Sequence, residues 1–594
     1  MPENILIAIA WPYANAEIHV GNITGSHLPG DIVARYHRLK GDHVLMVSGT
    51  DSHGTPVTIA ADKEGIPVEE VYKKYHNGFI DLFTKLGIQY DLFTSTHTEN
   101  HFKVSQSMFL ALQKNGFLFT RKTMQWYSPA AKRFLPDRYV EGTCYICGFT
   151  GARSDQCDHC GNVLEPEKLI NPKSKVDAST PELRETEHYF LDLSKLEPEV
   201  TDFLRKRSNY MRETVLGESL GKIEAEGLKP RPITRDLDWG IPVPVEGWDD
   251  KRLYVWFEAV IGYLSAAIEW AKLSGSEESW KNWWVNPDAK AYYFIGKDNI
   301  FFHTALWPAE LMGAGGQFLQ IFSEEEGALN VPFDVPANQF MNLEGQKISG
   351  SRNWAIWGRD ALTRYDPDAL RYYLTINMPE NHDSDWDWKE FVAKNNGELV
   401  ATWGNLANRV LSFSYRHWDG SVPTIDMAAL RPADLNLLSS IEAGFQTVGG
   451  FLESVKLRAA LQEAFRLAAT VNQYLDQMSP WQAIKTDINS AGLTIFTALK
   501  AIDSLKILFS PFLPFTCETL NGFFGYKTAL FGEPYTETVK DSLGDHLVLK
   551  YRGDENARWM ASQLTPGSKL NQPVPLFKKL EESVIEEERA RLGK

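Results

Sequence analysis

The stretch ILIAIAWPYANAEIHVGN, residues 5–22, places an apolar run, a loop and a helix start in direct succession. The run ILIAIAW is nearly continuous, which predicts a strand buried on both faces of a parallel sheet. Its loop ends in HVGN, just before a segment with helical spacing. A strand–loop–helix junction presents backbone N–H groups and the positive end of a helix dipole, so it is a candidate phosphate site.

Three residues of HVGN carry this hypothesis. His19 and Asn22 lie three residues apart, so both side chains point the same way if a helix starts beneath them. Gly21 lacks the side chain that would block a ligand. His donates through its ring N–H and Asn through its amide, as developing phosphate charge requires. Taken alone, the stretch fits an ordinary loop as well.

The α/β rhythm continues after this junction. Residues 28–40 keep helical spacing, and Gly41 is placed to end that helix. DHVLMVSG predicts a second strand, and TDSHGTP a turn into a helix with Pro56 near its start. The rhythm stops near 117 and returns in RLYVWFEAVIGYLSAAIEW and AYYFIGKDNIFFHTALWPAEL. This predicts a doubly wound α/β domain split by an inserted module at about 117–230.

Beyond about residue 388 we expect no strands. Long amphipathic segments instead predict a helical bundle; they span residues 395–418, 452–478 and 491–514. The last sixteen residues, KLEESVIEEERARLGK, predict a charged helix or a frayed end.

Composition limits the function classes. A chain of 594 residues is too long for one core, so two to four domains are expected. The net charge of −16 argues against coating nucleic acid by bulk attraction, but leaves room for a local basic patch. No apolar run reaches about 18 residues and the N-terminus lacks a basic start, so we expect a cytoplasmic protein without a membrane span.

Four of the five cysteines form two Cys-x₂-Cys pairs, Cys144 with Cys147 and Cys157 with Cys160. Four thiolates at this spacing are typical of a closed, structural Zn²⁺ site. Two disulfides are the alternative, which a reducing compartment disfavours. Cys517 stands apart and is expected to be a small buried hydrophobe.

A second candidate phosphate segment is EGQKISGSRN, residues 344–353. Lys347 lies in a loop rich in Gly and Ser, where it could serve as a mobile cation. An ordinary exposed hairpin turn explains the same residues.

The motifs together carry a family resemblance. HVGN resembles the HIGH signature, and KISGS the KMSKS signature, of class I aminoacyl-tRNA synthetases. Further stretches resemble methionyl-tRNA synthetases and occur in the same order, from about residue 4 onward. They are AWPYANAEIHVGN, SGTDSHGTP, the split cysteine module, VWFEAVIGY, GKDNIFFHTALWP and WGNLANR. Several independent motifs in one order are far more specific than any one of them.

The resemblance implies a Rossmann-like class I catalytic domain, split by a zinc-binding insertion and followed by an all-α anticodon-binding bundle. The expected segments are 1–116 and 231–325 for the two catalytic halves, 117–230 for the insertion, 326–388 for a stem-contact region with the KISGS loop, 389–545 for the anticodon bundle and 546–594 for a tail.

The implied reaction joins methionine and ATP into methionyl-adenylate and pyrophosphate, then transfers methionine to the 3′-terminal adenosine of tRNA(Met), initiator tRNA included. His19, Asn22 and Lys347 would carry the transition-state charge, with Mg²⁺ bridging the leaving phosphates. The implied ATP contacts are Gly21, Gly296, Asp298, Lys347, Ser349 and Ser351. Asp298 would reach a ribose hydroxyl, although an Asp at a turn is often an N-cap.

Two positions depart from the family signatures. Asn22 stands where a second His is usual; its amide still donates a hydrogen bond, but it cannot become an imidazolium. Gly350 stands where a second Lys is usual, so one cation is missing from the loop. Arg352 could add charge, and a solvated or tRNA-facing role fits it equally.

Similarity also implies a methionine pocket, with Asp51 facing the ammonium group. Its implied lining is Ala10, Trp11, Tyr13, Trp256, Ala259, Tyr263, His303 and Trp307. Aromatic rings suit a polarizable thioether, while core packing is the alternative for each Trp. Val260 replaces a common Pro and Asn299 a common apolar residue, so those two contacts differ from the family pattern.

In the bundle, the resemblance implies recognition of the CAU anticodon. Asn405 and Arg409 are four residues apart, so they share a helix face. Ser479-Pro480-Trp481 predicts an N-cap, Pro at N1 and a Trp exposed at the helix start, which could stack on a base. We expect a monomer.

Other proteins of the same fold fit the sequence less well. Ile, Val and Leu enzymes carry a large editing insertion, and a cysteinyl enzyme is more compact. A nucleotidyltransferase of the same fold would not need the bundle. The main alternative is a catalytically weakened tRNA-binding paralogue, which Gly350 favours and the retained His19, Asp51 and Lys347 oppose.

Overall fold

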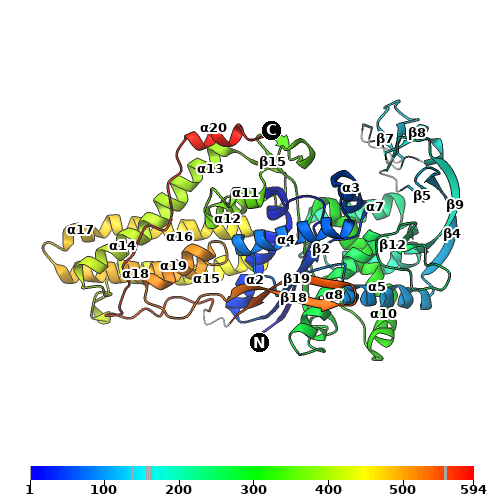
Figure 1. The fold of residues 1–594 in the computed structure, drawn as a ribbon. Coiled ribbons are helices and arrows are strands. Elements are labelled where there is room, and N and C mark those ends of the chain that lie inside the picture. Colours follow the sequence, from blue (N-terminus) through cyan, green and yellow to red (C-terminus); the bar gives the residue numbers. More distant parts are fainter. Residues whose placement is uncertain are drawn as a thin grey trace.

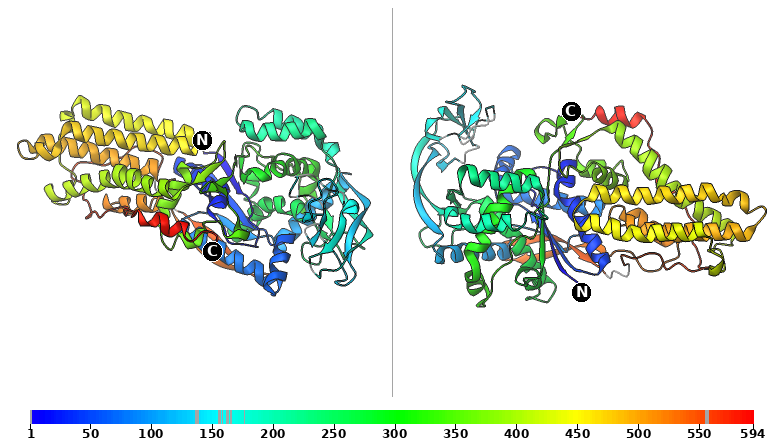
Figure 2. Two further views of the ribbon diagram at one scale, coloured as in Figure 1. Left: turned by 90° about the horizontal axis from the view of Figure 1, so that it is seen from above. Right: turned by 180° about the vertical axis from the view of Figure 1, so that it is seen from behind.

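The computed structural model describes residues 2–135, 139–154, 157, 159–160, 164, 166–175, 177–553 and 558–594. A helical bundle extends to one side of a central α/β domain, and a module of strands lies on the other side (Figures 1 and 2). This confirms the predicted split α/β fold followed by helices.

The central sheet has seven strands, five of which run parallel in the order β14-β13-β1-β2-β3. Their bounds are β1 (Asn4–Ile9), β2 (His43–Thr50), β3 (Leu92–Ser95), β13 (Lys290–Gly296) and β14 (Ala337–Asn338). Ile5 to Ile9 are completely buried, as expected for a strand covered on both faces. Residues that follow these strands therefore meet at one edge, the usual ligand-binding edge of such a sheet.

The connection from β1 to β2 is helical. A short α1 (Val20–Asn22) continues through a widened turn at Ile23–His27 into α2 (Leu28–Lys40). Gly41 ends α2 at φ +91°, as predicted. The next helices are α3 (Thr55–Glu64), with Pro56 in its first turn as predicted, α4 (Val68–Leu86) and α5 (Glu99–Lys114).

The inserted module contains a long, curved antiparallel pair and a small sheet (Figure 1). The large sheet joins β4 (Leu118–Ser128), β5 (Arg133–Phe134), β9 (Glu182–Leu191) and β10 (Arg231–Pro232). The small sheet joins β6 (Val140–Thr143), β7 (Ala152–Arg153) and β8 (Ile170–Ser174) around the cysteine pairs. The helices α6 (Glu197–Arg205) and α7 (Glu213–Glu226) lead back to the catalytic domain.

The second catalytic half contributes α8 (Val255–Leu273), β13 and α10 (Trp307–Ser323). Beyond it lies a three-stranded sheet of β15 (Met341–Leu343), β16 (Gln346–Lys347) and β17 (Ser384–Trp386). The short α11 (Gly358–Ala361) and α12 (Pro367–Ile376) lie between β16 and β17 in the chain, and α12 packs against the bundle.

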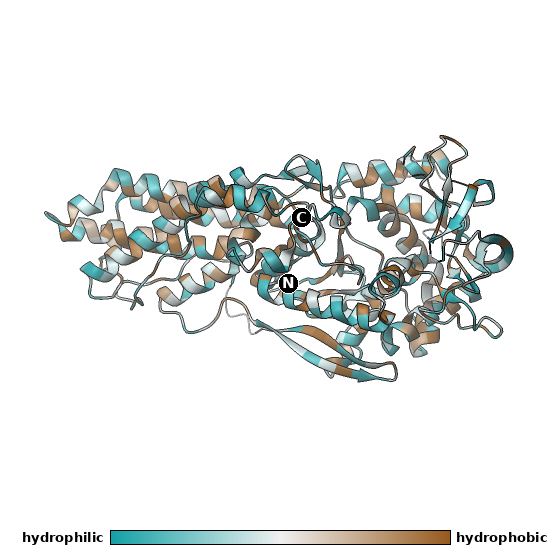
Figure 3. Ribbon diagram, turned by 45° about the horizontal axis from the view of Figure 1, so that its top comes forward, coloured by the Kyte–Doolittle hydropathy of each residue, from teal (hydrophilic) through white to brown (hydrophobic). Residues whose placement is uncertain are grey.

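The bundle confirms the predicted helical segments as α14 (Asn405–His417), α16 (Leu457–Met478) and α18 (Ile488–Phe509), and the predicted helix start as α17 (Pro480–Ala483). It also contains α15 (Pro432–Glu453) and α19 (Pro514–Phe523). Hydrophobic and hydrophilic residues alternate along these helices, as amphipathic packing requires (Figure 3). Cys517 on α19 is completely buried, as expected.

A buried cation joins the bundle to the catalytic domain. Arg371 on α12 is completely buried, and its Nη2 lies 2.7 Å from Asp31 of α2. The same guanidinium donates to the backbone carbonyls of Leu86, Pro511 and Phe512. One side chain thus fixes α2, the end of α4 and the α18–α19 turn relative to one another.

The expectation of no strands after residue 388 is wrong. β18 (Glu533–Asp541) and β19 (Gly544–Arg552) form a hairpin that extends the central sheet, with β19 antiparallel to β3. β19 is the inner strand of the pair, with Val548, Leu549 and Lys550 buried, and β18 forms the more exposed edge of the sheet. The predicted all-α segment 389–545 and the tail 546–594 therefore each contribute one strand of this hairpin.

The final segment returns to the KISGS loop. The predicted charged helix forms as α20 (Ser583–Arg589), beside β15 in Figure 1. Arg589 Nη2 lies 2.9 Å from Glu344, before the loop, and Gly593 N donates to Asn353 O, after it. Among the described residues, no helix is long and apolar enough to cross a membrane.

Candidate functional site

HVGN forms the helix start that was predicted, and the structure shows in addition that this start is capped. Asn22 N donates to His19 Nδ1 at 3.3 Å, and His19 N donates to Asn22 Oδ1 at 3.2 Å. Each side chain thus caps the backbone of the other residue. The atoms left to face a ligand are the imidazole Nε2 and the amide Nδ2.

The imidazole of His19 is neutral. Burial lowers the pKa of His19 to about 4, so it carries one ring proton at neutral pH. Since Nδ1 accepts from Asn22 N, that proton resides on Nε2. His19 can therefore donate one hydrogen bond to a phosphate without carrying a full charge.

The structure brings the two signature segments together. A Cβ on Gly21 would lie 3.2 Å from Ile348 Cδ1 of the KISGS loop and 3.0 Å from the His19 ring, so Gly21 allows this close approach. Val20 N donates to Ile356 O, and Gly358 N donates to Ile18 O. The chain after the loop thus pairs with both sides of His19.

The KISGS loop is an exposed hairpin, as one of the two explanations of these residues predicted. This shape is also compatible with the other explanation, in which Lys347 binds phosphate. Two backbone hydrogen bonds between Ser349 and Trp354 close it, and Trp354 Nε1 anchors it on Leu343 O. Ser349 and Ser351 face each other with Oγ atoms 3.3 Å apart. Lys347 is exposed at the end of β16.

The GKDN turn lies at the carboxyl edge of β13 and approaches Lys347. The Nζ atoms of Lys297 and Lys347 lie 4.2 and 5.2 Å from the centre of the Phe340 ring. Gly296 leaves room for Asp298, whose Oδ1 would be 2.9 Å from an added Cβ. The predicted ATP contacts thus come from three segments around one edge of the sheet. They are Gly21, Gly296, Asp298, Lys347, Ser349 and Ser351.

Most of the predicted methionine-pocket residues also form one group. Trp11 packs between Gly49 and Gly262, because a Cβ on either glycine would overlap its indole. Tyr263 Oη donates to His303 Nε2 at 2.7 Å, since His303 Nδ1 donates to Asn299 O. Trp256 stacks on Phe302 at 4.0 Å and meets Tyr13 edge-on.

The remaining predictions differ in exposure. Ala10 and Ala259 are partly exposed near these rings, and Val260 is buried. Trp307 is completely buried and lies edge-on to Trp284, so core packing accounts for it.

Asp51, which directly follows β2, is 3% exposed. One of its carboxylate oxygens accepts from His53 N at 3.3 Å. Burial and the nearby Glu258 carboxylate raise the pKa of Asp51 well above that of an ordinary aspartate. A cationic ligand such as an ammonium group would stabilise the carboxylate form of this buried side chain.

Sequence reasoning missed the buried network behind Asp51. Glu258, in the first turn of the apolar α8, accepts from His53 at 2.9 Å and from His101 at 2.7 Å. Burial alone would raise the pKa of Glu258, but the two imidazoles outweigh it and hold that pKa well below its usual range. The signal was a glutamate inside VWFEAVIGY, since an acid in an apolar helix requires partners.

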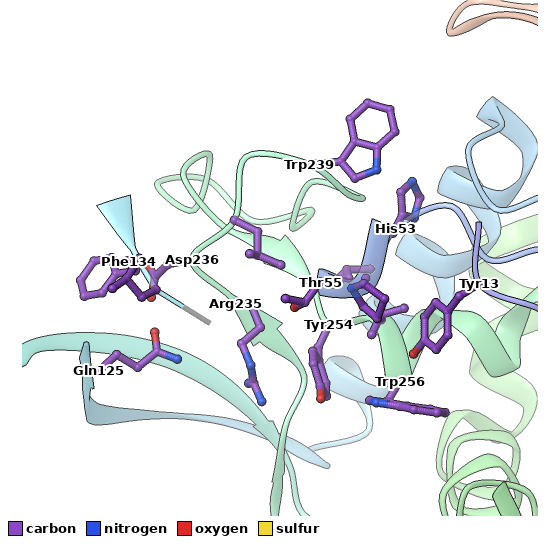
Figure 4. Close-up of a pocket in the computed structure, with 16 residues that line it drawn as sticks. Tyr13, His53, Thr55, Gln125, Phe134, Arg235, Asp236, Trp239, Tyr254 and Trp256 are labelled. Atoms are coloured by element: carbon purple, nitrogen blue, oxygen red, sulfur yellow. The ribbon is translucent and has the colours of Figure 1, made fainter. Parts of the chain in front are cut away.

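A cavity of about 200 Å³ opens between the aromatic group and the inserted module (Figure 4). Tyr13 and Trp256 lie at one end of it, and Gln125 and Phe134 of the module at the other (Figure 4). Arg235 and Tyr254 lie between these ends, with the guanidinium 4.0 Å from the tyrosine ring centre.

The four clustered cysteines fit a single metal ion. Cys144, Cys147, Cys157 and Cys160 place their sulfurs within 4.8 Å of one another. Two of the separations are 4.0 and 3.6 Å. Zn–S bonds of about 2.3 Å place tetrahedral sulfurs roughly 3.8 Å apart, so the group matches a Cys₄ zinc site.

The bundle carries a separate cavity of about 470 Å³. Arg409 lies over the Trp481 ring at 4.9 Å, and Phe413 meets that ring edge-on. Trp481 is therefore half-buried, whereas the sequence predicted an exposed side chain. Ser479 occupies the N-cap position, but at φ +42° its hydroxyl bonds Asp476 O instead of capping the helix. Asn405 is exposed on α14, outside the lining of this cavity.

The two parts of the chain match two family models. Residues 5–411 match class I tRNA synthetases (M), and residues 425–543 match the anticodon binding domain of methionyl tRNA ligase.

Curated relatives and solved structures agree with these matches. The methionine--tRNA ligase of Thermomicrobium roseum is 50% identical over 595 residues, covering 100% of this chain and 99% of the relative. That of Roseiflexus castenholzii is 50% identical over 605 residues, with the same coverage. The crystal structure of Mycobacterium tuberculosis methionyl-tRNA synthetase bound by methionyl-adenylate has a TM-score of 0.76 at 22% identity, covering 97% of this chain and 100% of that one, which supports the fold. The chain belongs to the methionine--tRNA ligase family of class I tRNA synthetases.

Proposed function

We propose that the chain activates L-methionine with ATP and transfers it to tRNA(Met), initiator tRNA included. The observation that carries this proposal is the contact of HVGN with the KISGS loop, on the carboxyl side of the sheet where the buried Asp51 follows β2. Two phosphate-handling segments and an ammonium-binding carboxylate at one sheet edge match the two substrates of adenylate formation.

Adenylate formation is an in-line attack of a carboxylate oxygen on the α-phosphorus. The protein supplies positioning and hydrogen-bond donors rather than a covalent nucleophile. His19 Nε2–H and Asn22 Nδ2–H would donate to the phosphate oxygens, because their other polar atoms are held in the mutual cap. Lys347 would neutralise the charge that develops on the leaving pyrophosphate.

Asp51 would hold the methionine ammonium group at the end of β2. The side chain of methionine would then lie among Trp11, Tyr263 and Trp256, whose rings favour a polarizable sulfur. The other implied contacts are Ala10, Tyr13, Ala259 and His303.

Two metals belong to this proposal. Mg²⁺ would enter with ATP and spread the negative charge of the leaving phosphates, and Asp298 would reach the ribose, as the resemblance implies. One zinc ion would be held by Cys144, Cys147, Cys157 and Cys160, with a structural role because all four positions are filled by protein.

The anticodon would bind at the bundle cavity through Arg409 and Trp481, and Asn405, outside that lining but on the same face of α14 as Arg409, would contact the strand beside it. We further propose a cytoplasmic monomer. We also propose that the chain divides into the segments 1–116, 117–230, 231–325, 326–388, 389–545 and 546–594. The exception is the hairpin of β18 and β19, which belongs to the central sheet.

The competing function is a tRNA-binding paralogue with weakened catalysis, which the missing cation at Gly350 favours. The test is methionine-dependent exchange of labelled pyrophosphate into ATP, followed by charging of a transcript with a CAU anticodon. We expect exchange with methionine, no exchange with leucine or cysteine, and charging. Tight tRNA binding without exchange would favour the paralogue.

A further inference from the structure

The KISGS loop carries one lysine where its family signature carries two. Gly350 occupies the second position, and its absent side chain leaves room for Trp357, whose ring would lie 3.1 Å from an added Cβ. Trp357 is held there because its Nε1 donates to Asn353 Oδ1 at 2.8 Å. The loop itself is therefore packed for a residue without a side chain at this position.

A second lysine reaches the same place from the catalytic sheet. Lys297 follows β13 directly, and its Nζ lies 4.2 Å from the centre of the Phe340 ring, which also carries Lys347 Nζ at 5.2 Å. The positive charges of both lysines act on Asp298 and on Asp383. Two ammonium groups from segments 50 residues apart thus converge beside the implied ribose and phosphate contacts.

Lys297 is held at this point by a partner that phosphate could replace. Its Nζ lies 2.7 Å from Asp383 Oδ1, and both side chains are partly exposed, 26% and 45%. An ion pair in contact with solvent is weak, so a triphosphate with more negative charge can displace the aspartate. Asp383 also accepts from Phe340 N, so it stays in place when the lysine leaves.

We propose that Lys297 supplies the second cation for the ATP phosphates that Gly350 does not supply. This rests on the proposed function, since it concerns the same adenylation site. The Phe340 ring would then orient Lys297 and Lys347 toward one substrate, because cations favour the face of an aromatic ring.

The test is methionine-dependent ATP–pyrophosphate exchange with Lys297→Ala and Lys297→Arg. We expect kcat/KM for ATP to fall about a hundredfold in Lys297→Ala, as for loss of a transition-state donor, with KM for methionine unchanged. Lys297→Arg keeps the charge and should retain most of the activity. Equal losses in both variants, or exchange within about threefold of the unmodified chain in Lys297→Ala, would overturn the proposal.

Two further variants separate a phosphate contact from a structural ion pair. Asp383→Asn removes the partner of Lys297 but keeps the acceptor for Phe340 N, so exchange should stay within about threefold; a loss equal to that of Lys297→Ala would overturn the proposal. Lys290→Ala is the matched control, since Lys290 begins the same strand and pairs with Glu3. If the unmodified chain itself shows no exchange, the proposed function fails rather than this inference alone.

Discussion

His19 and Asn22 cap each other's backbone at the start of α1, with Asn22 N donating to His19 Nδ1 and His19 N donating to Asn22 Oδ1. This relationship gives Asn22 two roles. It holds the imidazole in the tautomer that donates through Nε2, and under our proposal it would present its own amide to the ligand.

Substitution of Asn22 separates these two roles. Asn22→Asp keeps an oxygen that caps His19 N but replaces the amide donor with a negative charge, so exchange should fall about a hundredfold with little change in thermal stability. Asn22→Ala removes the cap as well and should also cost about 1 kcal/mol of stability. Exchange kinetics and thermal unfolding measure both effects. Full exchange activity in Asn22→Asp would contradict a phosphate-donor role.

Asp51 predicts a pH dependence of methionine binding. Its pKa is raised in the free protein, and an ammonium ligand favours the carboxylate, so binding methionine requires loss of that proton. KM for methionine should therefore rise as pH falls through this raised pKa, at a higher pH than an ordinary aspartate would give. Asp51→Asn should raise KM for methionine by about 10- to 100-fold and abolish the pH effect. An unchanged pH profile in Asp51→Asn would exclude this carboxylate.

Removal of the metal should act locally on the cysteine module. We expect one zinc per chain by elemental analysis, and loss of that zinc in Cys147→Ser. The hydrophobic cluster around Cys144 and Cys157 should then become sensitive to protease, because metal binding and local folding are coupled. Cys517→Ser is the control, since Cys517 is buried in the bundle, and it should keep the zinc. Zinc retained at full stoichiometry in Cys147→Ser would refute the four-cysteine site.

Trp481 should affect charging but not adenylate formation. Base stacking on an aromatic ring contributes about 1–3 kcal/mol, so Trp481→Ala should lower kcat/KM for tRNA roughly 5- to 150-fold and leave exchange unchanged. Trp481→Phe keeps a ring and should lose less. Equal losses of charging and exchange in Trp481→Ala would indicate a general structural defect instead.

The local features of the site could be predicted from the sequence because they depend on neighbouring residues. The helix start at HVGN, the helix end at Gly41 and the spacing of the four cysteines all follow short-range rules. The HVGN and KISGS segments could be paired only through their family resemblance, since about 330 residues separate them.

The features that sequence reasoning missed depend on contacts between distant segments. Arg371 meets Asp31 only after the bundle docks on the catalytic domain. The hairpin of β18 and β19 needs the free edge of β3, which no local pattern within 533–552 reveals. A role for Lys297 is indicated only by its position over the Phe340 ring together with Lys347, and both of those residues lie more than 40 positions further along the chain.

The most direct test of the account is pyrophosphate exchange with Lys347→Ala, using Gln346→Ala, its exposed neighbour, as the control. If HVGN and KISGS form one ATP-activating site, Lys347→Ala should lose at least about a hundredfold in methionine-dependent exchange, while Gln346→Ala stays close to the unmodified chain. Exchange that is unaffected in Lys347→Ala would contradict the assignment of this loop to ATP activation.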